Sequence, residues 1–486
     1  MIGQAARAVF IGWVILRHGL PWTVYRDVKR RHLSNPDCGC AQDERMERRA
    51  LRLRRALQRL GPTFIKLGQF LSRRPDILPP AYLAELAELQ DRTSAMSIEL
   101  TRQRLEEVCI CRRSGPHKET RPTCLHCLGV EAVFDAFEWQ PVASASLAQV
   151  HRAVFQGRPA AVKVLKAGVI DTINVDLGLL WRLRWLVGRV LGIGRNMPVG
   201  EFLGEFRNRL LEEVDFELEG LNIERFGDGH PADAPVRGPA VEWALDRSDV
   251  LVLEFVEGVA MREWRGDREA CRQLAKVIAE DFLRQVFIHN FFHADPHAGN
   301  LFVKADGQVV YLDFGTTGQL DPAARRALYR IFQAIVHGDP DGAVEAVLSV
   351  GGTDRAAVDI DEFRLEVDRI IQRFRRRPGT PWTGPVIDAT RRHGIRLPRS
   401  ILLYAKAAML TETLVVELDP SFEILPVIRR MGLPILEQEV AAALRAVPER
   451  LPETLEQLAG LVRELPGILR ELRQRSGGPP GAAAQS

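Results

Sequence analysis

The stretch 291-FFHADPHAGN-300 decides between two interpretations of this chain. In the first, the alternation of His293, Asp295 and His297 is typical of a metal-binding turn. In the second, the same letters form a phosphotransfer loop. Asp295 would then orient or deprotonate the acceptor, and Asn300 would bind a metal ion.

A second motif, 313-DFG-315, follows this loop and favours phosphotransfer. The residues between the two motifs, 301-LFVKADGQVVYLDF-314, predict a hairpin with an Asp-Gly turn. Such a hairpin would bring Asn300 and Asp313 close together, and an amide with a carboxylate is the usual pair that holds Mg²⁺ against nucleotide phosphates. The loop, the hairpin and the DFG motif together are a far more specific signal than DFG alone.

Phosphotransfer also needs a cation for the phosphates, and Lys163 meets this need. It lies in the apolar run 160-AAVKVL-165, which is predicted to pair with 147-LAQVHRAVF-155 across the turn 156-QGRP-159. A lysine inside an apolar strand requires an anion. The acidic stretch 212-EEVDFELEGLNIERF-226, predicted as one helix, offers Glu213, Asp215 and Glu219.

Upstream of this lysine, 142-VASASLAQV-150 stands where a glycine-rich phosphate loop would be. It carries alanines and serines, so its backbone amides can bind phosphate while the Cβ atoms restrict the approach. An ordinary turn is the alternative. The residues assigned to nucleotide binding here are Ala143, Ser144, Ala145 and Ser146.

The order of the predicted elements indicates a two-lobed α+β fold. Residues 1–108 are predicted to form a helical extension, 131–258 a small β-rich lobe, and 259–435 a helical lobe that carries the catalytic loop. A cysteine-rich insert at 109–130 separates the first two regions. Residues 436–486 predict amphipathic helices with a disordered end, suited to packing on the parent domain or to docking on a membrane or partner.

The composition is that of an ordinary globular protein, with 46% hydrophobic and 27% charged residues. A net charge of +3 is too small to argue for nucleic acid as a partner. No apolar run reaches the roughly 18 residues of a membrane span. The basic runs Arg26 to Arg31 and Arg45 to Arg55 are either solvated helix faces or contacts to anionic lipid. We therefore expect a cytoplasmic protein, peripheral at the inner face of a membrane.

The cysteine-rich insert contains two close pairs of thiols. Four thiolates at this spacing suit a tetrahedral structural Zn²⁺ site. Reduced cysteines without a ligand role, or a redox or iron–sulfur role, are the alternatives. The residues are Cys109, Cys111, Cys124 and Cys127.

Taken together, these motifs resemble the UbiB-type atypical kinase family, the bacterial relatives of the mitochondrial coenzyme Q kinases. The resemblance runs from about Leu60 to about Leu320, and it implies a protein kinase-like fold with a KxGQ motif on an N-terminal helix. Ala298 departs from it, because the family usually has proline there. The motifs are 61-GPTFIKLGQFLS-72, 142-VASASLAQVHRA-153, 161-AVKV-164, 213-EVDFELEGLN-222, 293-HADPHAGN-300 and 312-LDFG-315.

The resemblance also implies roles for individual residues. Glu219 would pair with Lys163, and Asp295 would be the catalytic-loop aspartate. Asn300 and Asp313 would ligate Mg²⁺. His293 is expected to brace the loop from within, whereas His297 would lie near the phosphates.

The KxGQ motif has a separate expected role. Lys66 and Gln69 would enter the active site where a protein substrate would otherwise sit, and Glu213 and Asp215 would help to hold them. The end of the predicted strand 249-DVLVLEFVEG-258 would contact the nucleotide through Glu254 and Val256.

The expected function is an ATP- and Mg²⁺-dependent atypical kinase or ATPase that supports isoprenoid quinone biosynthesis or membrane lipid homeostasis. The expected partners are a nucleotide, a lipid or quinone precursor, a membrane surface and quinone-biosynthesis proteins. Few residues separate Gly315 from a predicted helix start at Asp321, which argues against phosphorylation of other proteins. The alternatives are a non-catalytic, nucleotide-dependent lipid chaperone or scaffold, and a metal-dependent hydrolase built on the 293–297 turn.

Overall fold

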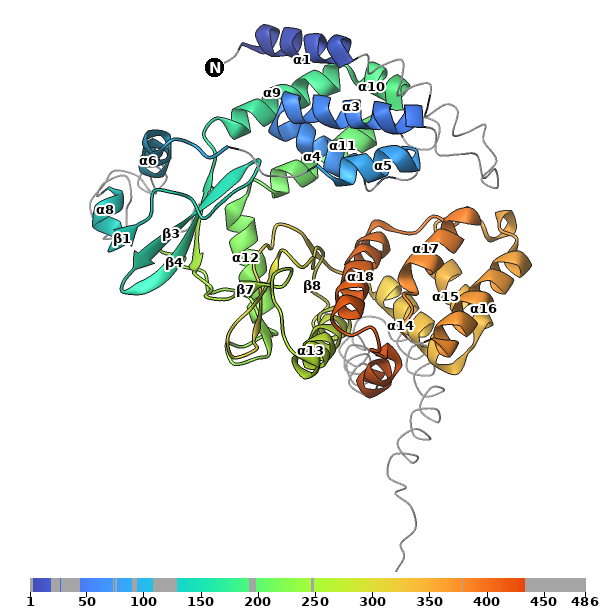
Figure 1. Ribbon diagram of the computed structural model, residues 1–486. Helices are drawn as coiled ribbons and strands as arrows, with labels where there is room; N and C mark the ends of the chain where they lie inside the picture. The colour runs from blue at the N-terminus through green and yellow to red at the C-terminus, as the bar shows by residue number, and fades with distance from the viewer. Residues whose placement is uncertain are drawn as a thin grey trace, which may run out of the picture. The chain divides into compact units, whose positions relative to one another are not determined.

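The computed structural model describes residues 3–18, 27, 44–72, 74, 77–89, 94–107, 129–191, 198–245, 249–377 and 379–432 (Figure 1). The chain forms two compact units. The first comprises Met1–Ile223 and Pro239–Phe255, and the second Glu224–Gly238 and Val256–Ser486. The four insert cysteines and the region 436–486 lie outside the described residues, so the predictions made for them stay predictions.

The first unit contains a sheet with the strand order β1-β3-β4-β6, to which β2 adds by pairing with β3. The hairpin of β3 and β4 was predicted and is confirmed, but its turn is shorter than expected. Gln156 and Gly157 form it with φ values of 51° and 72°, the left-handed backbone that two-residue hairpins require. Arg158 and Pro159 therefore belong to the strand. The strands are β1 Ala136–Phe137, β2 Ala143–Ser144, β3 Ala148–Phe155, β4 Arg158–Leu165 and β6 Val250–Glu254.

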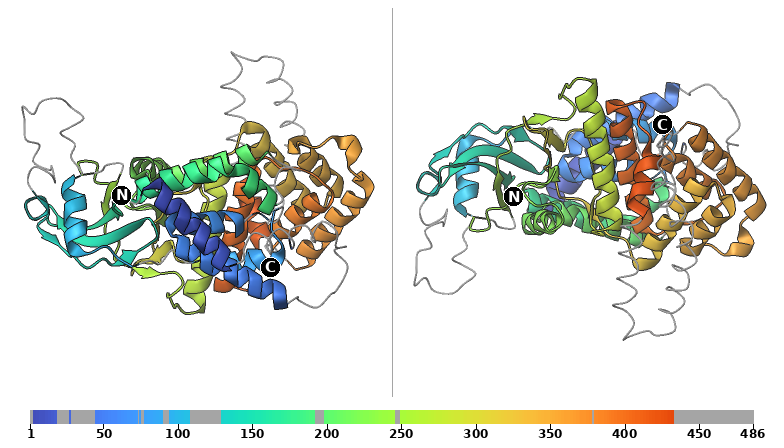
Figure 2. Two further views of the ribbon diagram at one scale, coloured as in Figure 1. Left: turned by 90° about the horizontal axis from the view of Figure 1, so that it is seen from above. Right: turned by 90° about the horizontal axis from the view of Figure 1, so that it is seen from below.

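Helices make up the rest of the first unit, and several of them pack as a layered group around α4 (Figures 1 and 2). Gly68 shows how close this packing is, because a Cβ atom there would lie 2.8 Å from the Leu57 side chain of α3. Among the described helices, none has both the length and the hydrophobicity to span a bilayer. The helices are α1 Gln4–His18, α3 Glu44–Leu60, α4 Pro62–Ser72, α5 Pro80–Ala87, α6 Ile98–Glu107, α8 Val130–Val133, α9 Val169–Arg182, α10 Arg184–Leu191 and α11 Val199–Glu212.

One predicted element of the first unit was wrong in detail. The acidic stretch 212–226 is two helices rather than one, because α11 ends at Glu212 and α12 spans Phe216–Gly227. The Asp215 carboxylate accepts a hydrogen bond from the Leu218 amide at 3.1 Å, which starts a new helix instead of continuing the old one.

The second unit contains two small sheets. One has the order β5-β10-β9-β7, and the other pairs β11 with β8. The predicted hairpin between the two motifs is confirmed, with β9 and β10 joined by a turn in which Gly307 has a φ of 84°. The strands are β5 Val236–Arg237, β7 Val259–Ala260, β8 Phe292–His293, β9 Leu301–Val303, β10 Val309–Tyr311 and β11 Thr317–Gly318.

Six long helices form the body of the second unit, and their apolar faces meet in one core. Aspartates begin four of these helices, since the carboxylates of Asp267, Asp321, Asp339 and Asp359 each accept a hydrogen bond from an amide of the first turn. The predicted helix start at Asp321 is thus confirmed. The helices are α13 Arg268–Phe287, α14 Pro322–His337, α15 Pro340–Val350, α16 Ile360–Arg376, α17 Thr383–Arg392 and α18 Arg399–Leu418, with a short 3-10 helix at Arg355–Ala357.

Candidate functional site

Lys163 lies in the middle of the first unit's sheet and is paired with Glu219. On β4, Val162 and Val164 are fully buried on one face, so the intervening lysine points to the other. Its Nζ donates to Glu219 Oε1 at 2.8 Å and to Oε2 at 2.6 Å, and it lies 4.9 Å from the Phe216 ring centroid. The Glu219 side chain is 3% exposed. Of the three acidic candidates, packing thus selects Glu219 as the counter-ion.

The KxGQ motif lies on α4, and its two polar side chains have different partners. Lys66 Nζ is 2.7 Å from Glu213 Oε2, which agrees with the expected role of Glu213. Gln69 Nε2 donates to the Leu89 carbonyl at 3.0 Å. Asp215 caps α12 through the Leu218 amide, so the geometry of the first unit gives it a structural task of its own.

The alanine-rich segment is a tight hairpin end rather than an open loop. Ala143 and Ser144 pair with β3 as strand β2, and the Ala145 amide donates to the Ala148 carbonyl at 2.8 Å. Ser146 is 1% exposed. Part of the backbone donor set expected for phosphate is therefore used within the hairpin itself.

The end of β6 holds the other residues expected near the nucleotide. The Glu254 carboxylate accepts from the Ala240 amide at 3.3 Å, and the Glu254 amide donates to the Ala240 carbonyl at 2.9 Å. Val256 follows and is buried. These bonds fix the backbone after the strand.

In the second unit, His293 braces the Asp295 loop from within, as predicted. Its Nε2 bonds to the Asp313 carbonyl, and its Nδ1 accepts from the Asp295 amide at 3.2 Å. Burial lowers the pKa of His293 below its usual value, and the hydrogen bond to the Asp313 carbonyl only partly offsets this. A neutral ring with one N–H matches this pattern of one donor and one acceptor. One side chain therefore ties the Asp295 loop to the DFG motif.

Behind the loop lies a buried polar network that the sequence did not reveal. The His293 amide donates to Gln285 Oε1 at 2.9 Å, and Gln285 Nε2 donates to Asp281 Oδ2 at 2.6 Å. The other Asp281 oxygen lies 2.7 Å from His230 Nε2. Burial lowers the pKa of His230, but the hydrogen bond and charge of Asp281 raise it overall. Because these groups satisfy one another, the network holds the loop backbone in one position.

Asp295, the expected catalytic-loop aspartate, is paired with Lys406 of α18. Lys406 Nζ lies 2.6 Å from Asp295 Oδ1, and both side chains are about one-fifth to one-quarter exposed. Sequence reasoning missed this lysine. A signal was present, because Lys406 interrupts the apolar run 401-ILLYAKAAML-410 in the same way that Lys163 interrupts its strand. Lys406 places a positive charge at the carboxylate that would face the acceptor.

Asn300 and Asp313 lie at the two ends of the hairpin, as predicted. The Leu312 amide donates to the Asn300 carbonyl at 2.9 Å, which makes the two ends neighbours. Asn300 Nδ2 donates to the Asp295 carbonyl at 3.3 Å, so its nitrogen is held by the loop and its oxygen is the side-chain atom suited to a metal. Asp313 Oδ1 accepts from the Gly315 amide at 3.0 Å. One amide oxygen and one carboxylate fit Mg²⁺, which prefers oxygen ligands and takes few from protein.

The turn at 293–297, which could be interpreted as a metal-binding turn, does not have the geometry of a metal site. Both ring nitrogens of His293 are used by the backbone, and His297 Nδ1 accepts from the Gly299 amide at 3.0 Å. Within the described residues, no three His, Cys, Asp or Glu side chains are grouped so that they could hold a metal ion. The hydrolase interpretation therefore has no donor set in this turn.

We expect removal of the Lys406 charge to slow the ATP turnover that the sequence motifs predict. In Lys406→Gln, kcat should fall by roughly ten- to a hundredfold, because a charge-assisted contact to a partly buried carboxylate contributes about 1.5–3 kcal/mol. ATP affinity should change little, since Lys406 touches the loop aspartate. Steady-state kinetics with ATP titration separate the two quantities. Lys304→Gln, which removes another carboxylate-bound lysine, is the matched control, and equal rates in the two variants would contradict the assigned role.

Comparison with known proteins shows what this chain is similar to. Residues 126–347 match the ABC1 atypical kinase-like domain. An uncharacterized Synechocystis sp. protein is 31% identical over 78% of this chain and 65% of its own length. The chloroplastic protein ACTIVITY OF BC1 COMPLEX KINASE 8 of Arabidopsis thaliana is also 31% identical, over 64% of this chain and 40% of its own length. The chain thus spans less than two thirds of these two relatives.

A solved structure of a Mycobacterium tuberculosis protein in complex with erythromycin is 22% identical, with a TM-score of 0.47, and the match covers 78% of this chain and 97% of that one. The domain match and the mixture of sheet and predominant helix confirm the predicted α+β, kinase-like fold class. The chain thus contains an ABC1 atypical kinase-like domain, and it is similar to proteins of the ABC1/UbiB family, as the sequence motifs predicted.

Proposed function

We propose that this protein binds ATP with Mg²⁺ and acts as an atypical kinase or ATPase. The observation that carries the proposal is the bidentate Lys163–Glu219 ion pair in the sheet of the first unit. A lysine held in this way by a buried glutamate presents a fixed positive charge, which is the role that kinases give to such a pair at nucleotide phosphates. A purely structural core would favour apolar residues at these positions.

The second unit carries the other residue types that phosphotransfer uses. Asn300 and Asp313 would hold Mg²⁺, which would neutralise charge on the phosphates. Asp295, held near Lys406, would orient the acceptor hydroxyl or water. His293 and the buried network behind it keep these groups in place, so little reorganisation is needed at the moment of reaction.

The proposal is tested by incubating the purified full chain with ATP in the presence and absence of Mg²⁺. We expect turnover that depends on Mg²⁺ and stops when EDTA is added in excess. Phosphate release and nucleotide binding are measured in parallel. If ATP neither binds nor is hydrolysed, with or without phospholipid vesicles, the proposal fails.

The acceptor is proposed to be water or a small lipid-like molecule rather than a protein. After Gly315, only the short strand β11 precedes α14 at Pro322. A conventional protein kinase uses a long segment here to seat a peptide, and this length leaves no room for one. By family resemblance, we further propose a role in isoprenoid quinone or prenyl-lipid metabolism.

A non-catalytic, nucleotide-dependent chaperone or scaffold for lipids is the second candidate. It would need a nucleotide site but no aspartate poised for an acceptor. The Asp295–Lys406 pair favours catalysis, because a scaffold gains nothing from a charged pair at that loop. Tight ATP binding without any turnover would favour the scaffold.

A surface on α1, α9 and α10 supports docking on an anionic membrane. Residues 181–185, in the order Trp-Arg-Leu-Arg-Trp, are all exposed, and Trp185 is 65% exposed. Helix α1 packs against α9 (Figure 2). It exposes further apolar side chains, including Trp13 at 46%. Tryptophan mixed with arginine is typical of membrane-interface surfaces, where rings insert and cations meet headgroups.

The end of α1 is also basic. Arg17 and Arg59 both lie over the Trp13 ring, at 5.1 and 5.9 Å from its centroid. Burial lowers the pKa of His18, and four arginines around it lower it further. Such a concentration of positive charge next to exposed aromatic rings suits phosphate-bearing lipid headgroups.

We expect Trp181→Ala/Trp185→Ala to weaken binding to vesicles of 30% phosphatidylglycerol in phosphatidylcholine by roughly tenfold or more, because each ring contributes apolar area to the interface. Co-sedimentation measures the bound fraction. Leu365→Ala/Leu402→Ala removes two exposed apolar side chains from the second unit and should leave binding unchanged. Equal loss in both double variants would contradict the assigned surface, and binding to pure phosphatidylcholine vesicles should be weak throughout.

A further inference from the structure

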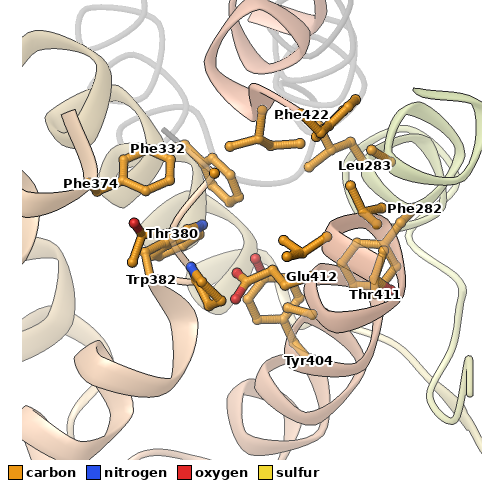
Figure 3. Close-up of a pocket in the computed structure, with 17 residues that line it drawn as sticks. Phe282, Leu283, Phe332, Phe374, Thr380, Trp382, Tyr404, Thr411, Glu412 and Phe422 are labelled. Carbon is orange, nitrogen blue, oxygen red and sulfur yellow. The ribbon is translucent and has the colours of Figure 1, made fainter. Parts of the chain in front are cut away.

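The helical body of the second unit contains a pocket that uses none of the residues assigned to phosphotransfer (Figure 3). Its volume is about 60 Å³, which suits a short hydrocarbon chain or part of one ring. Six aromatic side chains, each from a different segment, contribute to the lining. They are Phe282, Phe332, Phe374, Trp382, Tyr404 and Phe422.

One carboxylate, that of Glu412 on α18, belongs to this lining and points toward Trp382 (Figure 3). Its Oε1 accepts a hydrogen bond from the Thr383 hydroxyl. Its Oε2 is buried and has no hydrogen-bond partner within the part of the chain that the structure describes. Burying a carboxylate oxygen without a partner is costly, so this arrangement calls for a group that the pocket receives from outside.

The electrostatic surroundings of Glu412 also indicate that the pocket receives a group from outside. Burial raises the pKa of Glu412 to about 7. Hydrogen bonds from the Thr383 side chain and from the backbone of Thr383 and Trp382 lower it, but they offset the effect of burial only in part. Among the described residues, no cationic side chain contributes to lowering it. Tyr404 is the other titratable group of the lining, and burial together with the Glu412 charge raises its pKa. A cation is therefore what this carboxylate lacks.

The chemistry of the lining restricts the chemical class of the ligand further. Buried carboxylates in proteins are normally paired with cations, and aromatic ring faces attract ammonium groups at close range. A hydroxylated ligand would satisfy one hydrogen bond but leave the charge unbalanced. An anion would be repelled.

We propose that this pocket binds the ammonium group of a small hydrophobic amine, with Glu412 as its counter-ion and the aromatic side chains around its hydrocarbon part. The site does not depend on nucleotide chemistry. Glu412 lies on α18, the helix that also carries Lys406, the partner of Asp295. Occupancy can be measured by binding alone, without any assay of turnover.

The test is isothermal titration of the full chain with n-hexylammonium chloride at pH 8, beside 1-hexanol and sodium hexanoate. We expect hexylammonium to bind at least tenfold more tightly than hexanol, and hexanoate not to bind. Glu412→Gln should weaken hexylammonium binding at least tenfold. Glu417→Gln, an exposed glutamate on the same helix, should leave it unchanged.

A second variant tests the pocket independently of any folding defect in Glu412→Gln. Val416 lines the pocket and is only half-buried, so Val416→Phe fills the space while keeping Glu412. It should also abolish hexylammonium binding, with thermal unfolding like that of the wild type. The proposal is overturned if the wild type does not bind hexylammonium, if hexanol binds equally well, or if Glu412→Gln binds as the wild type does.

The pH dependence gives an independent readout. The amine pairs with the ionised form of Glu412, whose fraction rises from about one-tenth at pH 6 to about nine-tenths at pH 8 for the pKa of about 7. Binding by the wild type should therefore be roughly tenfold tighter at pH 8 than at pH 6. Glu412→Gln should show a flat profile over this range, and a flat wild-type profile would contradict the proposal.

Discussion

Asp313→Asn is expected to lower Mg²⁺-dependent ATP turnover by at least a hundredfold. The substitution keeps the size of the side chain and an oxygen that can accept from the Gly315 amide. It removes the negative charge that would bind Mg²⁺, and the metal is what neutralises the developing charge on the phosphates. Phosphate release at saturating ATP, with Mg²⁺ varied, measures the loss.

The matched control lies in the same hairpin. Asp306→Asn alters the exposed turn between β9 and β10, where the carboxylate accepts from the Gln308 amide. This variant should retain wild-type turnover. Thermal unfolding within a few degrees of the wild type for both variants would show that the fold is intact. Full turnover in Asp313→Asn would remove this residue from the proposed metal site.

Lys163→Met is expected to weaken ATP binding by roughly a hundredfold and to destabilise the protein as well. ATP binding is weakened because the phosphates lose their fixed cation. The folded protein is destabilised because Glu219, whose side chain is only 3% exposed, keeps its charge without its bidentate partner. Breaking a buried pair on one side typically costs about 3–5 kcal/mol, and somewhat less here because Lys163 is 23% exposed.

A double variant separates these two effects. Lys163→Met/Glu219→Met removes both charges and places two flexible apolar side chains where the pair was. We expect it to recover much of the lost stability, because an ion pair and a well-packed apolar pair often have similar free energies. ATP binding should stay as weak as in the single variant. Recovery of nucleotide binding in the double variant would show that Lys163 acts structurally and does not contact the phosphates.

The sequence determined the features that depend on neighbouring residues. The β3–β4 and β9–β10 hairpins follow from apolar runs around glycine-containing turns. The proximity of Asn300 and Asp313 follows from the second of these hairpins. The helix start at Asp321-Pro322 also follows from local capping chemistry. Even the error in the acidic stretch was local, since Asp215 could have been recognised as the cap of a new helix.

Only the tertiary structure decided which distant side chains meet. The pairing of Lys163 with Glu219, the Lys406–Asp295 pair and the hydrogen bond from the His293 amide to Gln285 each join two different elements. Packing likewise leaves one Glu412 oxygen without a hydrogen-bond partner among the described residues, and it leaves residues 181–185 exposed. Spacing in sequence fixes turns and caps, because these involve a few adjacent residues. Pairing of charges across elements depends on how whole faces pack, which no short stretch encodes.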